Sequence, residues 1–193
     1  ALAALAAIAS LKAAFENGFS EIEQLDEDGD LANVRKHPDF AGLRKELVAK
    51  GEAAAKAKVK ALLATNKPFP FDFELKNLDG KTVKLADFKG KVTIVDVWGT
   101  WCPPCRKEIP HFVELHKKLG DKGLAIVGIN YEGGEDPKDD IKKIKDFVKE
   151  NKVPYDCVIG DEKTQKQIPN FEGYPTTLFL DRAGVVRAKL VGY

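Results

Sequence analysis

Two cysteines three positions apart, Cys102 and Cys105, are the residues of this sequence whose types and spacing are best suited to chemistry. They follow the apolar run at 92–97 and precede a segment with helical spacing of apolar side chains, so they stand where a buried strand gives way to a helix. A thiol at the first turn of a helix meets unpaired backbone N–H groups, which favour its thiolate form. Because the thiolate attacks disulfides, we predict that Cys102 is the accessible attacking cysteine and that Cys105, the more buried thiol, resolves the mixed disulfide.

The residues around the two cysteines support this interpretation. Pro103 and Pro104 cost little in the first turn of a helix, where their missing N–H has no partner, and they stiffen the loop. Arg106 and Lys107 add positive charge that further favours a thiolate. Trp101 precedes the pair, and we expect it to contact the substrate together with the two prolines.

Two acids are candidates for moving the proton of Cys105. Asp96 lies six residues before Cys102 in an otherwise apolar strand, where desolvation would raise the pKa of its carboxyl group and let it accept the proton. Glu108 lies three residues after Cys105, on the same face of the helix. Either acid could instead be a structural or solvated carboxylate. We favour Asp96 as the base and keep Glu108 as the second candidate.

Rival chemistries for the cysteine pair fit less well. Together with His111 and His116, the two cysteines make up a set of residue types that can bind zinc. All four residues would lie on one helix, however, and a single helix cannot surround an ion with four ligands. A c-type haem needs histidine where Arg106 stands. We therefore expect no metal and no cofactor besides the redox-active disulfide. The third cysteine, Cys157, lies in an apolar strand, and we predict that it is a buried small hydrophobic residue.

Composition excludes several classes of protein. The chain has 193 residues, of which 44% are hydrophobic and 32% charged, so it is a globular protein. The net charge is +1, so the chain lacks the excess of positive charge that is typical of nucleic-acid-binding proteins. No apolar run in the sequence approaches the roughly 18 residues that a helix needs to cross a bilayer. We expect a monomer.

The chain changes character near residue 68, which suggests two parts. Residues 1–50 are predicted to form a helical segment and residues 51–67 a linking helix with a mostly alanine face. Residues 68–193 alternate strands and helices in the order β-α-β-α-β-β, after a hairpin around Asp79–Gly80. This order predicts an α/β fold with a central mixed sheet flanked by helices.

The sequence from 68 to 193 resembles thioredoxin-like thiol-disulfide oxidoreductases of the TlpA/ResA type. The segments that carry the resemblance are WGTWCPPCRKEIP at 98–110, YPTT at 174–177, FLDRAGVV at 179–186 and LADFKGK at 85–91. The resemblance implies a thioredoxin-like fold with an N-terminal β-hairpin extension and without its last helix. It matches Pro175 to the cis-proline that faces the disulfide and Tyr174 to the residue whose backbone pairs with substrate. Asp96 departs from this group, which more often has asparagine there.

The family resemblance also implies a setting. It suggests a reductant of protein disulfides in the periplasm or another exported compartment, tethered through a missing N-terminal region and recharged by a membrane electron donor. A peroxiredoxin-like peroxide reductase is an alternative, although its Pro-x-x-x-Thr-x-x-Cys setting is absent. A second alternative is a non-catalytic docking module that uses the thioredoxin scaffold.

The N-terminal part has a resemblance of its own. Residues 19–47 are similar to the end of a tetratricopeptide-repeat array, which implies protein docking by this helical segment. An unrelated helical hairpin would fit the same pattern.

Overall fold

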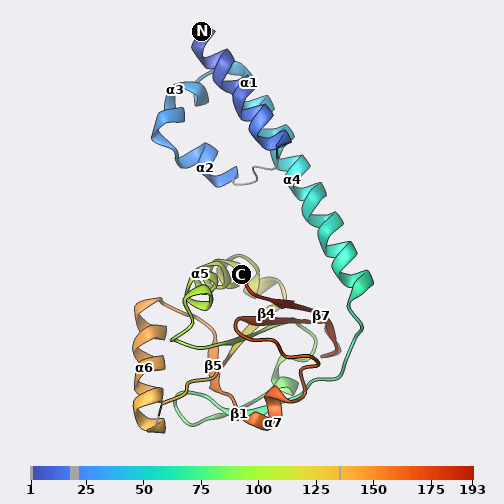
Figure 1. Ribbon diagram of the computed structural model, residues 1–193, viewed down its shortest axis with the longest axis vertical. Coiled ribbons are helices and arrows are strands. Elements are labelled where there is room, and N and C mark those ends of the chain that lie inside the picture. Colours follow the sequence, from blue (N-terminus) through green and yellow to red (C-terminus); the bar gives the residue numbers. More distant parts are fainter. Residues whose placement is uncertain (1, 18–21, 135) are drawn as a thin grey trace. The chain divides into compact units, whose positions relative to one another are not determined.

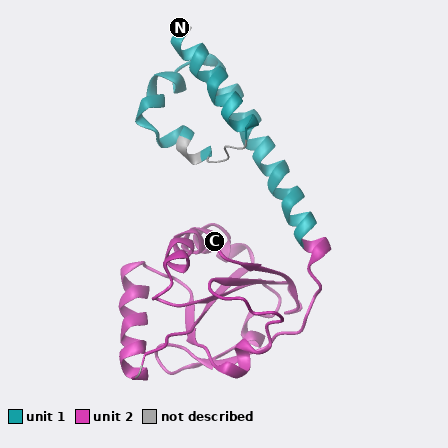
Figure 2. Cartoon of the chain, viewed as in Figure 1, with its two compact units in different colours: residues 1–62 teal, residues 63–193 magenta. Residues whose placement is uncertain are grey.

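The computed structural model describes residues 2–17, 22–134 and 136–193. The chain divides into two compact units, residues 1–62 and 63–193 (Figure 2). Within the described residues, no helix combines the length and the apolar character that crossing a membrane requires.

The first unit is helical, as predicted. Its elements are α1 (Leu2–Glu16), α2 (Ile22–Glu27), η1 (Gly29–Leu31), α3 (Ala32–Arg35) and the first part of α4 (Pro38–Thr65). Five buried side chains form its core: Leu25, Val34, Phe40, Leu43 and Leu47. Residues 18–21 lie outside the described part of the chain, so the resemblance of residues 19–47 to a repeat end stays a prediction.

The boundary that we predict at residue 50 is not an element boundary, because α4 is one helix of 28 residues. The helix continues through Gly51, since a single glycine costs only about 1 kcal/mol inside a helix and the alanine- and lysine-rich residues after it have high helix propensity. Leu47 is its last buried residue, and Val59 and Leu63 are exposed.

The second unit is built on a five-stranded mixed sheet with the order β5-β4-β3-β6-β7. Its strands are β3 (Val92–Trp98), β4 (Leu124–Asn130), β5 (Asp156–Ile159), β6 (Thr176–Leu180) and β7 (Val186–Val191). β3, β4 and β5 run parallel to one another, whereas β6 is antiparallel to both β3 and β7. The predicted mixed sheet is therefore confirmed.

Helices follow the strands as the sequence pattern indicates. They are α5 (Pro103–Leu119), η3 (Gly120–Lys122), α6 (Pro137–Glu150) and a short α7 (Glu162–Gln165) that the pattern did not predict. Figure 1 shows the second unit with α5 and α6 beside its strands. The side chain of Asp136 caps α6 by accepting a hydrogen bond from the backbone N–H of Lys138 at 2.8 Å, and Pro137 occupies the first turn.

The predicted hairpin forms a separate two-stranded sheet of β1 (Glu74–Lys76) and β2 (Thr82–Lys84), followed by η2 (Leu85–Phe88). β1 begins only at Glu74, because the backbone N–H of Asp72 donates to the side chain of Gln167 instead of to a strand. Phe71 and Phe73 are nevertheless buried in the core.

Alternation along β3 divides the core between the two faces of the sheet. Val95 and Val97 point to one face, where they pack with the hairpin. Ile94 and Trp98 point to the other face, where they pack with the apolar side of α5 and with Ile144 of α6. Asp96 lies between these two residues in the sequence, so it faces α5 as well.

Candidate active site

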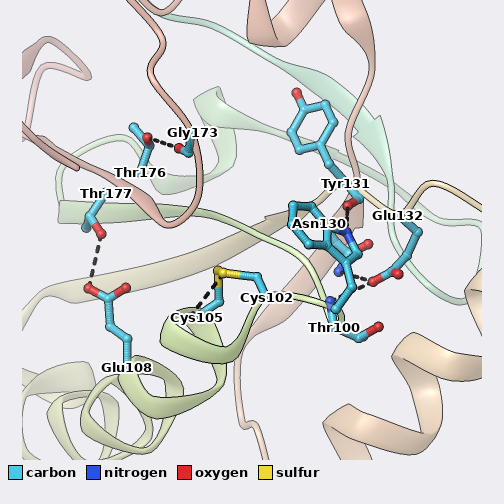
Figure 3. Close-up of a disulfide and its surroundings, with 11 residues drawn as sticks. Thr100, Cys102, Cys105, Glu108, Asn130, Tyr131, Glu132, Gly173, Thr176 and Thr177 are labelled. Atoms are coloured by element: carbon cyan, nitrogen blue, oxygen red, sulfur yellow. Dashed lines mark hydrogen bonds between the residues drawn. A yellow bond between two sulfur atoms is a disulfide. The ribbon is translucent and has the colours of Figure 1, made fainter. Parts of the chain in front are cut away.

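The two cysteines stand at the amino end of α5, as predicted. Cys102 is the N-cap residue, and its sulfur accepts a hydrogen bond of 3.2 Å from the backbone N–H of Cys105. Pro103 and Pro104 occupy the first positions of the helix. Cys102 and Cys105 are joined by a disulfide with a Cα–Cα distance of 5.3 Å (Figure 3). A sulfur at this position lies against free N–H groups that stabilise a thiolate once the bond is reduced.

The prediction that Cys102 is accessible is wrong for the disulfide form. Cys102 is 2% exposed and Cys105 is 0% exposed. The bonded sulfurs pack into the apolar cluster beneath α5, with the partly buried Tyr174 packed against that cluster. The neighbouring Trp101, in contrast, is 55% exposed. An incoming thiolate must therefore displace covering side chains to reach the disulfide.

A loop opposite the helix brings Tyr174 and Pro175 to the site. The Tyr174–Pro175 peptide bond is cis, as the family resemblance implied. The Tyr174 ring meets Trp101 edge-on, with ring centroids 5.2 Å apart, and also contacts Phe171 and Tyr131. Its hydroxyl accepts a hydrogen bond of 2.6 Å from the side-chain amide of Gln165. The two predicted substrate residues Trp101 and Tyr174 thus form one aromatic surface.

The two candidate acids lie on the same side of the sheet. Asp96 is paired with Thr177 across β3 and β6, and the Thr177 hydroxyl donates a hydrogen bond of 3.2 Å to Glu108 Oε1 (Figure 3). Asp96 is 1% exposed, and in the described part of the chain neither of its carboxyl oxygens has a hydrogen-bond partner.

Burial changes the acidity of both carboxyl groups. Desolvation raises the pKa of Asp96 well above its ordinary value, and the nearby charge of Glu108 adds to the effect. Desolvation also raises the pKa of Glu108, although the hydrogen bond from Thr177 opposes it. Two carboxyl groups with raised pKa values, one on β3 and one on α5, are candidates to hold and pass protons at this site.

Glu132 is a site residue that the sequence pattern missed. Its Oε1 accepts hydrogen bonds from the backbone N–H of Thr100 at 2.7 Å and from the side chain of Asn130 at 3.2 Å (Figure 3). The indole N–H of Trp101 donates to the carbonyl of Tyr131 at 2.8 Å. These bonds fasten the loop before Cys102 to the end of β4. A glutamate two residues after a buried strand carries no signal for this role, since it depends on the parallel pairing of β3 and β4.

The remaining cysteine and tryptophan occupy the core. Cys157 is free and buried, which confirms the prediction for it, and Trp98 is 1% exposed. Among the described residues, no group of three or more histidine, cysteine, aspartate or glutamate side chains is arranged to hold a metal ion.

A mixed sheet, a C-x-x-C disulfide at the start of its central helix and a cis-proline in the loop before β6 define a thioredoxin-like fold with a dithiol–disulfide site. The chain belongs to the AhpC/TSA family, whose family model matches residues 65–189. This match covers the whole sheet apart from the end of β7.

Curated relatives carry names from thiol-disulfide chemistry. The chain is 37% identical over 121 residues to the thioredoxin-like protein YneN of Bacillus subtilis, which covers 63% of this chain and 68% of that protein. It is 33% identical over 123 residues to the thiol-disulfide oxidoreductase ResA of Bacillus cereus, covering 63% of this chain and 66% of that protein. It is 41% identical over 128 residues to the thiol:disulfide interchange protein DsbE of Pseudomonas fluorescens, covering 65% and 66%. The matches thus span about two thirds of these relatives.

Solved structures share the fold. A thiol:disulfide interchange protein of the thioredoxin family from Chlorobium tepidum aligns with a TM-score of 0.57 at 29% identity, over 66% of this chain and 88% of that chain. A DsbF homologue from Corynebacterium diphtheriae aligns with a TM-score of 0.54 at 31% identity, over 63% and 76%.

Proposed function

We propose that this protein is a dithiol reductant of protein disulfides. The observation that carries the proposal is the Cys102–Cys105 disulfide at the amino end of α5, beside the loop of Tyr174 and Pro175. The relatives named as thiol-disulfide oxidoreductases and interchange proteins support it. In this proposal the cysteine pair carries the two electrons, and no further cofactor is required.

The reaction proceeds by two exchanges. In the reduced protein, the Cys102 thiolate attacks one sulfur of a substrate disulfide, which forms a mixed disulfide and releases one substrate thiolate. The Cys105 thiol then gives its proton to Asp96, and the resulting thiolate attacks the Cys102 sulfur. This step forms the Cys102–Cys105 bond and releases the second substrate thiolate. Two electrons pass from the cysteine pair to the substrate.

The aromatic surface of Trp101 and Tyr174 supports the choice of a protein substrate. Trp101 is 55% exposed beside the buried sulfurs, and aromatic side chains bury much apolar area when a partner covers them. In this proposal a substrate segment lies along the Tyr174–Pro175 loop, contacts Trp101 and the two prolines of the helix start, and brings its disulfide to Cys102.

The proposal extends to the setting of the protein. We further propose that it works in an exported compartment, where a membrane electron donor would return it to the dithiol form, as the resemblance to the TlpA/ResA type implies. Equilibration with glutathione buffers measures the reduction potential, and about 30 mV shifts this two-electron equilibrium tenfold. A potential near that of thioredoxin, about −270 mV, supports a reductant, whereas one near −120 mV would indicate an oxidant of thiols.

Reduction of insulin disulfides with dithiothreitol as the electron source tests the activity. Cys102→Ser should abolish it, whereas Cys157→Ser, which changes the cysteine outside the pair, should leave it intact. Activity that survives in Cys102→Ser would refute the proposed nucleophile. Consumption of hydrogen peroxide, measured with the same variants, separates the peroxide-reductase alternative: rapid consumption that depends on Cys102 would favour that alternative.

A further inference from the structure

Buried oxygen atoms without partners gather beneath α5. Within the described part of the chain, they include both carboxyl oxygens of Asp96, Oε2 of Glu108 and the hydroxyl of Tyr155. An unsatisfied buried polar group costs about 1–3 kcal/mol, and such groups are usually satisfied by ordered water. The charges of Asp96 and Glu108 both act on the Tyr155 hydroxyl, so the three groups are neighbours in the core.

The register of the sheet shows how these groups are placed. Cys157, Gly128, Asp96 and Thr177 form one row across β5, β4, β3 and β6. Gly128 has no side chain, and a Cβ there would lie 2.7 Å from Trp98 Nε1 and 3.3 Å from the Cys157 sulfur. Tyr155 directly precedes β5 and is buried in the same cluster as Cys157, on the side of the sheet that faces α5.

Tyr155 also borders a cavity at the far end of α5. The cavity has a volume of about 420 Å³, and its lining includes Tyr155, Asp156, Ile126 and, from the last turn of α5, His116 and Lys117. The rings of His116 and Tyr155 are 6.2 Å apart. Cys102 caps the opposite end of this 17-residue helix, roughly 25 Å away along its axis. Tyr155 therefore lies between the core that holds Asp96 and a polar opening remote from the disulfide.

We propose that Tyr155 is a positioning residue for the proton acceptor: its hydroxyl is hydrogen-bonded through water to the Asp96 carboxylate and links that group to the cavity at the end of α5. This inference rests on the proposed function, in which Asp96 receives the Cys105 proton. In the mixed disulfide the substrate covers the front of the site. The proton then leaves on the side away from the substrate, from Asp96 to the bridging water that the Tyr155 hydroxyl holds and on toward the cavity that Tyr155 borders.

Several other groups face these two residues and enter the pH dependence. The titratable or polar side chains on the Asp96 side of the sheet are Cys105 and Glu108 of α5, Cys157 of β5 and Thr177 of β6. Those that line the cavity beside Tyr155 are Lys91, His116, Lys117, Asp121 and Asp156. Burial raises the pKa of the Cys157 thiol and of the Tyr155 hydroxyl, so both stay protonated around neutral pH. Tyr155 can therefore donate a hydrogen bond to a carboxylate.

The variant Tyr155→Phe tests the proposal, because it removes one oxygen and keeps the ring. In the reduced protein, the titration of the Asp96 carboxyl carbon is followed by NMR. Loss of a donor to the carboxylate should raise its midpoint by about one pH unit. The rate at which Cys105 resolves a mixed disulfide should fall severalfold and its pH profile should move in the same direction. The matched control is Tyr193→Phe, an exposed hydroxyl that contacts His111, which should leave both readings unchanged.

An unchanged midpoint in folded Tyr155→Phe would overturn the proposal. The double variant Asp96→Asn/Tyr155→Phe separates it from the proposed function, because it should resolve the mixed disulfide no more slowly than Asp96→Asn alone. Suppose that Asp96→Asn leaves the pH profile of the resolution rate unchanged while Tyr155→Phe moves the NMR titration midpoint of Asp96. The contact between Tyr155 and Asp96 is then supported, and the transfer of the Cys105 proton to Asp96 is refuted. If Cys102→Ser still reduces insulin, the proposed function fails independently of Tyr155.

Discussion

Thr177 connects the two candidate acids, because it is paired with Asp96 across β3 and β6 and its hydroxyl donates a hydrogen bond of 3.2 Å to Glu108. The threonine thereby stabilises the charged form of Glu108 beside the buried carboxyl group of Asp96. The hydrogen bond from Thr177 lowers the pKa of Glu108 but does not reach Asp96, so it sets the two carboxyl groups apart although both lie between the sheet and α5.

Thr177→Val should raise the pKa of Glu108 further. The substitution keeps the shape of a β-branched residue in β6 but removes the hydroxyl that lowers the pKa of the Glu108 carboxyl group. We expect the NMR titration midpoint of Glu108 to rise by roughly half to one pH unit. A midpoint that stays in place would show that the hydrogen bond does not influence this carboxyl group.

Asp96→Asn should stabilise the protein near neutral pH. The pKa of Asp96 is raised in the folded state from the ordinary value of 3.8 that applies to the unfolded chain. Between these two pKa values the folded protein binds more protons than the unfolded chain. The free energy of unfolding therefore falls as the pH rises toward the folded pKa. Asparagine has no charge to bury. We expect its free energy of unfolding at pH 7 to exceed that of the natural protein by roughly 1–3 kcal/mol.

Denaturant titrations at several pH values measure this difference. At pH 3, where Asp96 is protonated in both states, the gain should shrink toward zero, while the rate of resolution at neutral pH should be slower in the variant. A stability difference independent of pH would contradict a buried ionisable carboxylate. If the stability of Asp96→Asn changes as expected but the pH profile for resolution of the mixed disulfide stays that of the natural protein, Glu108 becomes the proton acceptor.

Gly128→Ala should destabilise the protein. The added Cβ would lie 2.7 Å from the indole nitrogen of the buried Trp98, so the core beneath α6 would have to shift. Overpacking of this kind costs about 1–3 kcal/mol, measured as a loss of unfolding free energy. Gly133→Ala is the matched control, because a Cβ there meets nothing within 4 Å. Equal stability of the two variants would contradict the packing around Gly128.

Glu132→Ala should weaken catalysis more than folding. It removes the acceptor of the Thr100 N–H and frees the loop that leads to Cys102. We expect insulin reduction to slow about tenfold, with a loss of roughly 1 kcal/mol in unfolding free energy. Glu132→Gln keeps an acceptor oxygen and should recover most of the rate. A Gln variant as slow as the Ala variant would point to the charge of Glu132 instead of its hydrogen bonds.

The sequence was sufficient for those features that depend on local pattern. The apolar run at 92–97 predicted β3, and the alternation of strands and helices predicted the mixed sheet. The spacing of Cys102 and Cys105 predicted the disulfide at a helix start. These features depend on the side chains of a few adjacent residues.

Features that depend on tertiary contacts could not be predicted from the sequence. The burial of Cys102 is set by Tyr174, more than 70 positions away in the sequence, and by the apolar cluster beneath α5. Glu132 reaches Thr100 only because β3 and β4 are parallel neighbours. The start of β1 depends on Gln167, whose side chain satisfies the backbone of Asp72.

Trapping of a mixed disulfide tests the central claim most directly. A reduced Cys105→Ser variant, mixed with an aromatic disulfide reagent or a disulfide-bonded peptide, should form a stable adduct at Cys102. The same experiment with Cys102→Ser should give little adduct at Cys105, because Cys105 lies inside α5 whereas Cys102 is its N-cap residue. Mass spectrometry of the digested adducts identifies the modified sulfur. An adduct that forms faster at Cys105 than at Cys102 would contradict the assignment of the attacking cysteine and, with it, the mechanism proposed for this protein.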